Sequence, residues 1–254
     1  MKRSLRFCVE GDARARILWK DGDRVLGRWI IELDGRQTPV LAVWPATERP
    51  TSSNLSRLTH EYGLKEELDG TWAARPLALV RESGRTALLL EDPGGEPLAG
   101  MLGSPMELSR FLRLAIGIAA ALSQLHRRRL IHKDLKPAHI LVNDNLGSAR
   151  LTGFGLASRL ARERHAPAPA EEITGTLAYM APEQARGKPV DKRADIWAYG
   201  VVLYEMLSGV RPFQGEDVSM TLASVMKSDI SVATLPHDVP PPVRNVLKRC
   251  LEKD

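Results

Sequence analysis

Two short stretches of the sequence hold side chains whose types and spacing could do chemistry. The first, LIHKDLKPAHILV, places Asp134, Lys136 and His139 ahead of an apolar run. The second, LTGFGLA at residues 151–157, carries a short apolar strand into a glycine-rich turn that begins at Gly153. A carboxylate at position 153 would make this turn a metal-binding loop of the kind that phosphoryl transfer requires. Glycine has no side chain, so the chemistry of the second stretch is incomplete.

The composition is that of an ordinary globular chain of 254 residues, of which 43% are hydrophobic and 26% charged. The net charge is +5, but basic residues are scattered apart from the run HRRRL, and aromatic residues make up only 5%. We therefore expect no nucleic-acid partner, because such surfaces combine basic patches with aromatic platforms. No run reaches the roughly 18 apolar residues of a membrane span. Two distant cysteines, Cys8 and Cys250, define no disulfide framework, and we expect a cytoplasmic chain.

The N-terminal third of the sequence predicts short strands and one helix. RVLGRWIIEL and TPVLAVW are rich in β-formers and are joined through Asp34 and Gly35, which predicts a hairpin. SSNLSRLTHEYGLKEEL repeats apolar residues at helical spacing, with Asn54 or a preceding serine as the N-cap. RPLALVRE and RTALLLE follow as two further strands joined by Ser83 and Gly84. The pattern indicates a small β-rich lobe.

Turn-forming residues in DPGGEP separate this lobe from a helical region. MELSRFLRLAIGIAAALSQLH has helical apolar spacing, and ADIWAYGVVLYEMLSG is apolar on nearly all sides, which predicts a buried central helix ending at Gly209. HILVN and ARLTG predict a hairpin around DNLG, and ARERHAPAPAEEITG predicts a mobile loop. We therefore expect an α+β chain with a β-rich lobe at 1–91, a hinge at 92–97 and a helical lobe at 98–254 whose last helix is truncated.

The sequence resembles the eukaryotic-type protein kinases. HKDLKP resembles their catalytic loop, and GFG, GTLAYMAPE, DIWAYGVVLYEML, RPF and RCLEKD follow in the family's order. The later part is similar to bacterial serine/threonine kinases. Earlier stretches, including LTHEYGLKEELDGTWAARPLALV and LTGFGLASRL, resemble the N-terminal kinase-like domain of very large bacterial signalling proteins, where an ATPase module and a sensor histidine kinase follow. The resemblance implies a two-lobed, protein-kinase-like fold.

The resemblance also implies site residues. Asp134 matches the base that accepts the substrate proton, and Lys136 matches the lysine that follows it. Leu90, Glu91 and Asp92 match the gatekeeper and hinge region, where backbone groups could still bind an adenine. These positions are consistent with a nucleotide between the lobes.

Other family positions carry residues that do not suit phosphoryl transfer. Trp44 aligns with the phosphate-binding lysine of the third strand, which leaves Glu61, its helix partner in the family, without a cation. VLGRWIIELDG offers Gly27 but no G-x-G-x-x-G pattern over the phosphates. His139 and Gly153 occupy the two magnesium positions, although imidazole is a poor ligand for Mg²⁺. A hydrogen-bonded structural role suits this histidine better. We expect at most weak ATP binding and no bound Mg²⁺.

For further residues the resemblance implies structural roles. His132 is expected to pack on Phe154, and Asp195 to hydrogen-bond the backbone of the catalytic loop. Glu183 and Arg249 resemble a buried ion pair that ties the activation segment to a late helix. These residues are interpreted as architecture rather than chemistry.

Two functions remain open. In the first, the chain is a regulatory pseudokinase that binds partners, and nucleotide only weakly, through a preserved fold. In the second, it is an active ATP-dependent serine/threonine protein kinase with Asp134 as its base. Independently of this choice, Thr174 is a candidate phosphorylation site and Thr176 is expected to contact the catalytic loop. The substitutions favour the first as chemistry, whereas the motifs favour the second as a family label. Either function implies a protein substrate or regulatory protein domains as partners, and further domains after residue 254.

Overall fold

The computed structural model describes most of the chain, and several sequence predictions fall in its gaps. It describes residues 15–22, 24–33, 36–82, 84–144, 147–159, 177–231 and 234–253. Outside these ranges lie Cys8, Asp34 and Gly35, Ser83, the middle of DNLG, the loop ARERHAPAPAEEITG, and the two threonines Thr174 and Thr176. What the sequence predicts for these residues stays a prediction.

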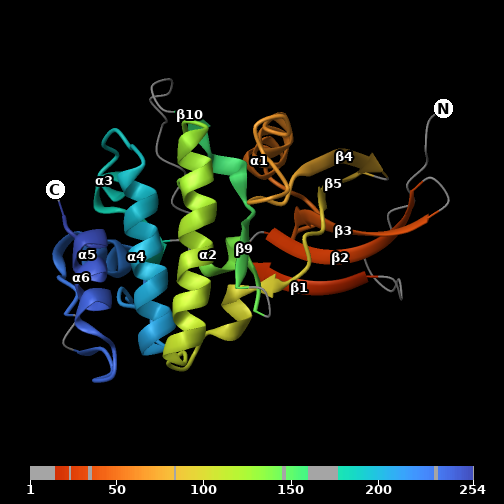
Figure 1. Cartoon of the computed structure of the whole chain (residues 1–254). Coiled ribbons are helices and arrows are strands. Elements are labelled where there is room, and N and C mark those ends of the chain that lie inside the picture. The colour runs from red at the N-terminus through yellow and green to blue at the C-terminus, as the bar shows by residue number, and fades with distance from the viewer. Residues whose placement is uncertain are drawn as a thin grey trace.

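The described chain forms two lobes that differ in secondary structure (Figure 1). The small lobe contains strands β1 Ala15–Asp21, β2 Arg24–Leu33, β3 Arg36–Pro45, β4 Pro76–Glu82 and β5 Arg85–Glu91, and helix α1 Ser52–Gly63. The large lobe contains helices α2 Leu108–Arg127, α3 Pro182–Ala185, α4 Arg193–Ser208, α5 Val218–Lys227 and α6 Pro241–Cys250. Its short strands are β6 Glu96–Pro97, β7 Leu130–Ile131, β8 Ile140–Asn143, β9 Ser148–Leu151 and β10 Ser158–Arg159. Its 3-10 turns are η1 Leu98–Met101, η2 Pro137–His139, η3 Phe154–Leu156 and η5 Leu177–Tyr179. This arrangement confirms the predicted two-lobed α+β fold.

The five strands of the small lobe form one antiparallel sheet in the order β1-β2-β3-β5-β4. The predicted hairpin of RVLGRWIIEL and TPVLAVW corresponds to β2 and β3, which pair along their whole length. The edge strand β1 was not predicted. Its register shifts between Ile17 and Trp19, and such a shift breaks the two-residue alternation by which a strand is recognised in a sequence.

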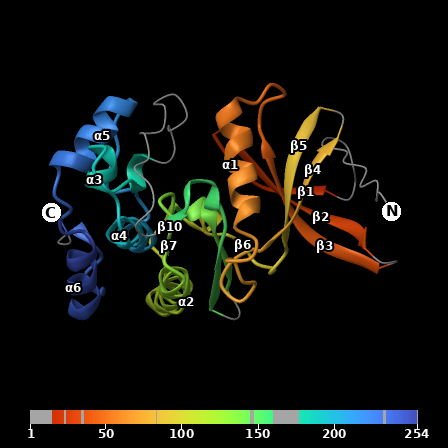
Figure 2. The same cartoon turned by 90° about the horizontal axis from the view of Figure 1, so that it is seen from above.

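The sheet presents apolar side chains on both faces. Side chains alternate between the faces along a strand, so Val43 and Trp44 point to opposite sides. The face toward α1 carries Leu26, Leu41, Val43, Leu88 and Leu90, which pack with Leu58 of α1. The other face carries Val25, Trp29, Val40, Ala42, Trp44 and Leu89. We call them the inner and outer faces, because α1 lies between the sheet and the large lobe (Figure 2).

Helix α1 begins with a capping box. Its N-cap is Thr51, whose hydroxyl accepts a hydrogen bond from the backbone N–H of Asn54 at 3.2 Å. The Asn54 side chain in turn accepts one from the backbone N–H of Thr51 at 2.9 Å. The prediction of Asn54 or a preceding serine as N-cap was therefore wrong, because Asn54 serves as the third helical residue of the box.

The large lobe is built around α4, as its apolar sequence predicted. Most of its 16 residues are buried, and the helix ends at Gly209, whose φ of 76° suits glycine. Helix α2 packs against α4 and β9. Among the described residues, α2 is the one helix that could cross a membrane by length and composition alone, and core helices of water-soluble folds share that composition.

Candidate functional site

The stretch between β7 and η2, residues 132–136, is here called the HKD loop, and it is held by Asp195 at the start of α4. The Asp195 carboxylate accepts hydrogen bonds from the backbone N–H groups of His132 and Lys133, both at 2.9 Å. It also lies 2.8 Å from Nε2 of His126. These contacts compensate a buried charge that would otherwise be costly. The predicted anchoring role of Asp195 is confirmed.

His132 is a packing residue at the base of the site. Its ring is fully buried and lies 4.8 Å from the ring of Phe154. Its Nε2 lies 2.9 Å from the carbonyl oxygen of Thr152. These contacts confirm the predicted packing and hold the start of η3 against the HKD loop.

The HKD loop brings Asp134 and Lys136 together between the lobes. Lys136 Nζ lies 3.8 Å from Asp134 Oδ1, and 2.5 Å from Oδ2 of Asp21 at the end of β1. Among the described residues, Asp134 Oδ1 is buried without a hydrogen-bond partner. A carboxylate in this position can accept a proton from a hydroxyl group. The two predicted residues therefore share one site, and the structure adds Asp21 to it.

His139 projects from η2 and lies beside Asp134. Its Nδ1 is 2.7 Å from the backbone oxygen of Asp134 and 3.5 Å from Oδ2. Burial lowers the pKa of His139 well below its ordinary value, and the positive charges of Lys136 and Arg24 add to this effect. The imidazole is therefore neutral and hydrogen-bonded, which agrees with a structural histidine.

The His139 ring also fills the space beside Gly153. Gly153 has a φ of 81°, and a Cβ atom placed on it would lie 2.6 Å from Cγ and Nδ1 of His139. Real Cβ atoms essentially never come so close to another heavy atom. A larger residue at 153 therefore requires His139 to move. The two magnesium positions of the resemblance hold a neutral ring and a glycine whose side-chain space is taken.

These residues do not fit a magnesium ion. Mg²⁺ requires hard oxygen ligands in near-octahedral geometry. The part of the chain that the structure describes has no group of three or more His, Cys, Asp and Glu side chains that could hold a metal. The nearby carboxylates of Asp21 and Asp134 both face the ammonium of Lys136, and this positive charge opposes a divalent cation.

Glu61 has a cationic partner, contrary to the expectation from the sequence. Its side chain is 0% exposed, and Oε2 lies 3.1 Å from a guanidinium nitrogen of Arg24, at the start of β2. Its Oε1 accepts a hydrogen bond from the backbone N–H of Gly153 at 3.1 Å. A buried carboxylate requires such pairing. The family pattern places this cation on the third strand, so the role of Arg24 on β2 was not predicted.

Trp44, which the resemblance matches to the family's lysine, does not lie on the face of the sheet that contacts Glu61. That lysine pairs with the helix glutamate, so it must leave β3 on the inner face. Val43 lies on that face with Leu58 of α1 and lines a cavity with Arg24. Trp44 lies on the outer face, where its ring stacks on Trp29 with 5.0 Å between centroids. Trp44 is therefore not placed to contact a nucleotide between the lobes.

Gly27 lies inside β2, opposite Ala42, rather than in a turn over the cleft. A Cβ atom on it would lie 2.8 Å from Cη2 of Trp44. Gly27 therefore makes room for the indole ring. The end of β1, just before the β1–β2 turn, carries the acidic side chain of Asp21.

The hinge offers few backbone donors to an adenine. Leu90 is fully buried on the inner face of the sheet. The backbone N–H of Glu91 donates to the carbonyl oxygen of Arg75 at 2.8 Å. Pro93 has no N–H at all. The predicted use of this backbone for nucleotide binding stays a prediction, and these contacts limit it.

Asp92 is bound by the small lobe. Its carboxylate accepts hydrogen bonds from Nε of Arg28 at 2.5 Å and from the backbone N–H of Gly94 at 2.9 Å. Arg28 also donates to Glu96 Oε1 at 3.1 Å and to the Gly95 oxygen at 2.7 Å. Burial lowers the pKa of Arg28, but its contacts with Asp92 and Glu96 outweigh this and raise it. A side chain of β2 therefore covers the hinge.

The predicted ion pair between Glu183 and Arg249 is not formed within the described residues. Glu183 is half-buried and Arg249 is exposed. Helix α6 turns Leu247 into the core, and the residue two positions later lies on another side of the helix. The buried carboxylate of this region is instead Glu205, which accepts a hydrogen bond from Tyr179 at 2.6 Å.

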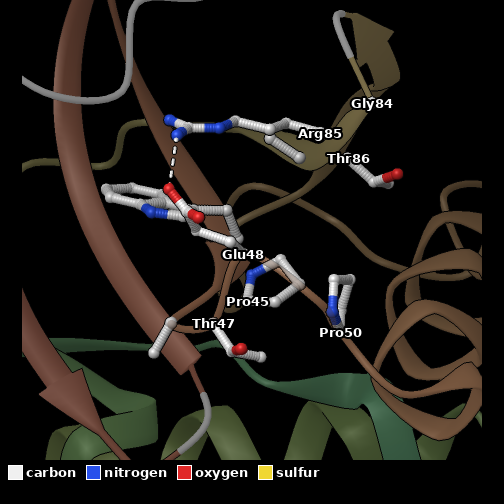
Figure 3. Close-up of a pocket in the computed structure, with 10 residues that line it drawn as sticks. Pro45, Thr47, Glu48, Pro50, Gly84, Arg85 and Thr86 are labelled. Carbon is white, nitrogen blue, oxygen red and sulfur yellow. Dashed lines mark hydrogen bonds and ion pairs between the residues drawn. The ribbon is translucent and has the colours of Figure 1, made fainter.

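The described residues line a small cavity between the lobes. A cavity of about 20 Å³, lined by Asp21, Arg24, Val43, His139 and Thr152 among others, has room for about one water molecule. A larger cavity of about 90 Å³ lies between the β3–α1 connection and the β4–β5 turn (Figure 3). Glu48 and Arg85 form an ion pair beside it at 3.5 Å.

Three charged residues at the site, Asp21, Arg24 and Arg28, were missed by sequence reasoning. The sequence contains one signal from which Arg24 and Arg28 could have been predicted. Arg24 and Arg28 lie two residues to either side of Leu26 in β2, so strand alternation places all three side chains on the inner face. Their partners lie between 37 and 68 residues away in the sequence.

The chain has a β-rich lobe with one helix, a helical lobe, and a loop that is anchored by a buried aspartate of a helix. These features define a two-lobed, kinase-like protein. A family model described as protein kinase domain matches residues 44–254. The chain belongs to this family.

Curated relatives are bacterial serine/threonine kinases. The DNA damage-responsive serine/threonine-protein kinase RqkA of Deinococcus radiodurans is 34% identical over 200 residues, which cover 78% of this chain and 28% of RqkA. The serine/threonine-protein kinase PrkC of Bacillus subtilis is 33% identical over 151 residues, which cover 59% of this chain and 23% of PrkC. A probable serine/threonine-protein kinase of Clostridium acetobutylicum is 31% identical over 169 residues, or 65% of this chain and 25% of that protein. The chain spans about a quarter of the length of these relatives.

Proposed function

We propose that this chain is a pseudokinase, a protein kinase domain that binds partners and has lost magnesium-dependent phosphoryl transfer. The contact between His139 and Gly153 carries the proposal, because the imidazole takes the space of the side chain at 153. Removing one preorganised charged group from an active site commonly costs roughly 10²–10³ in rate. The phosphate lysine is absent as well, since Val43 and Trp44 occupy the two candidate positions on β3.

The preserved architecture supports a binding role. Arg24 replaces the missing lysine as the partner of Glu61, His132 packs on Phe154, and Asp195 holds the HKD loop. These contacts fix the relative positions of α1, η3 and α4 without any nucleotide. A surface that recognises a protein partner depends on such fixed positions.

An active serine/threonine kinase is the second candidate, and one observation favours it. Asp134 keeps a buried carboxylate oxygen without a hydrogen-bond partner among the described residues. In an active enzyme that oxygen would accept the proton of a substrate hydroxyl, and Lys136 would stabilise negative charge beside it. ATP would then be the phosphate donor.

We infer that the domain works within a longer signalling protein, with protein domains as its partners and the cytoplasm as its location. The length of its relatives supports this inference, because the chain spans only about a quarter of them. The likeness of LTHEYGLKEELDGTWAARPLALV to the kinase-like domain of large bacterial signalling proteins supports it further.

The test measures thermal stability with ATP, with and without Mg²⁺ or Mn²⁺, and phosphate incorporation into a generic protein substrate. A ligand at 100 times its Kd stabilises a fold by about 2.7 kcal/mol, which a thermal shift detects. We expect no metal-dependent shift, and incorporation no higher than that of Asp134→Asn. Metal-dependent stabilisation together with transfer that Asp134→Asn abolishes would overturn the proposal and establish the active kinase.

A further inference from the structure

The β1–β2 hairpin carries charged side chains that bind three other parts of the molecule. It forms the edge of the small-lobe sheet (Figure 1). Arg28 binds the hinge through Asp92, Arg24 binds α1 through Glu61, and Asp21 binds the large lobe through Lys136. The hairpin is therefore fastened along its length rather than suspended over the cleft.

Among the described residues, the ion pair of Asp21 with Lys136 joins the hairpin to the HKD loop. Asp21 Oδ2 lies 2.5 Å from Lys136 Nζ, and the two side chains are 21% and 8% exposed. A buried ammonium requires an anion nearby. Asp134 is farther away, at 3.8 Å, so Asp21 supplies the closer carboxylate. The glycine-rich loop of the family presents backbone groups to phosphates, whereas this hairpin presents a negative charge.

Two other ion pairs, Arg24 with Glu61 and Arg28 with Asp92, hold the hairpin in the position from which Asp21 reaches Lys136. Arg24 is three residues from Asp21 and reaches Glu61, whose other oxygen accepts the Gly153 N–H. A cavity of about 20 Å³ lies beside these pairs, between the hairpin residues Asp21 and Arg24 and His139 of η2. Asp21 therefore reaches Lys136 from a hairpin that Arg24 already holds against α1.

We propose that the β1–β2 hairpin is a closed lid, latched to the HKD loop by the ion pair between Asp21 and Lys136. The Asp21 carboxylate serves as a built-in anion for Lys136, so the lobes stay together in the absence of any bound phosphate. The lid opens when this pair breaks. This latch goes beyond the proposed loss of phosphoryl transfer, because it concerns the shape of the nucleotide-free protein and depends on neither His139 nor Gly153.

Hydrogen–deuterium exchange of the free protein in EDTA, without nucleotide, tests the latch. Asp21→Asn removes the charge and keeps the shape, and Lys136→Gln removes the opposite charge. We expect each variant to exchange the amides of β1 and β2 faster, by at least about tenfold. The double variant should be no faster than the faster single variant, because both substitutions break the same pair. High salt should raise exchange in the wild type more than in Asp21→Asn.

Two references make the outcome decisive. Glu32→Gln removes an exposed carboxylate from the same hairpin and should leave exchange unchanged. The amides of α4 report global unfolding, and they should keep wild-type exchange in every variant. The latch would be overturned if the amides of β1 and β2 exchanged in Asp21→Asn at the wild-type rate. It would also be overturned if the amides of α4 were accelerated as much as those of β1 and β2. Neither result bears on metal-dependent transfer, so the latch and the proposed function can fail independently.

Discussion

The imidazole of His139 lies in the space that a side chain on residue 153 would occupy. A Cβ atom on Gly153 would meet three atoms of the ring at 2.6 to 2.7 Å. The two positions are therefore coupled by packing. A substitution at only one of these two positions therefore leaves the new side chain packed against an unchanged neighbour.

Gly153→Ala should destabilise the fold by more than its backbone conformation alone explains. The positive φ costs about 1–2 kcal/mol for a residue with a Cβ, and the clash with His139 adds about 1–3 kcal/mol. Urea unfolding measures the total. Gly187→Ala is the matched control, because Gly187 has a φ of 64° with nothing within 4 Å of a built Cβ. In a His139→Ala background the excess cost should disappear. Equal costs for the two glycine variants in the wild type would contradict the packing.

Arg24→Met should destabilise the fold by up to about 3–5 kcal/mol, because it leaves Glu61 as an unpaired buried carboxylate. Adding Val43→Lys should recover on the order of 1.5–3 kcal/mol by placing a cation on the inner face of β3. Adding Trp44→Lys instead should recover nothing, since that side chain lies on the outer face. Thermal and urea unfolding of the three variants measure this, and rescue by Trp44→Lys would support the match of Trp44 to the family's lysine.

The stability of the protein should fall as the pH drops below about 6.5. The pKa of His139 is lowered in the folded state, so the unfolded chain binds a proton that the folded chain excludes. The stabilisation is therefore complete above the unfolded pKa and is lost below it, by up to about 1.4 kcal/mol per pH unit. Urea unfolding between pH 7.5 and 5 should show this slope. His139→Gln should flatten it, whereas substitution of the exposed His237 should not. Parallel slopes for His139→Gln and the wild type would refute the assignment.

Gly27→Ala should cost about 1–3 kcal/mol, because the added methyl group meets the Trp44 indole on the outer face. Without such a contact, replacing glycine by alanine within a strand raises the free energy of unfolding by roughly 0.5–1 kcal/mol. A loss of stability in Gly27→Ala would therefore indicate the contact with Trp44. Trp44→Leu should relieve the cost. Gly63→Ala, at a position with nothing within 4 Å, should be neutral or stabilising. Denaturant unfolding measures all four variants, and a stabilising Gly27→Ala would count against the observed packing of Trp44.

Much of the fold followed from the sequence because its signals are local. The apolar run of α4 and Gly209 behind it define a buried helix and its end within a few residues. The pairing of β2 with β3 followed from two β-rich runs close together. The strand β1 was not predicted, because its register shift breaks the alternation of side chains between the two faces of the sheet. It is also an edge strand, which has a partner on one side only.

The candidate site likewise contains residues that local patterns predict and residues that they do not. Asp134, Lys136, His139 and Gly153 were predicted from motifs, because they lie within or beside short patterns that resemble those of one family. The face on which Trp44 lies was not predicted, because a strand changes faces at every residue, and a motif match that is off by one reverses the side chain. Arg24, which completes the buried pair with Glu61, lies 37 residues from it, and no local pattern links the two.

The sequence by itself determined the protein kinase fold, the HKD loop and the missing carboxylate at Gly153, since each depends on residue type and near-neighbour spacing. Only the tertiary structure decided which cation faces Glu61, which face of the sheet holds Trp44, and that Asp21 reaches Lys136. These relationships depend on distances between segments that are remote along the chain. Burial then fixes them, because a charge removed from water must find a partner wherever the fold provides one.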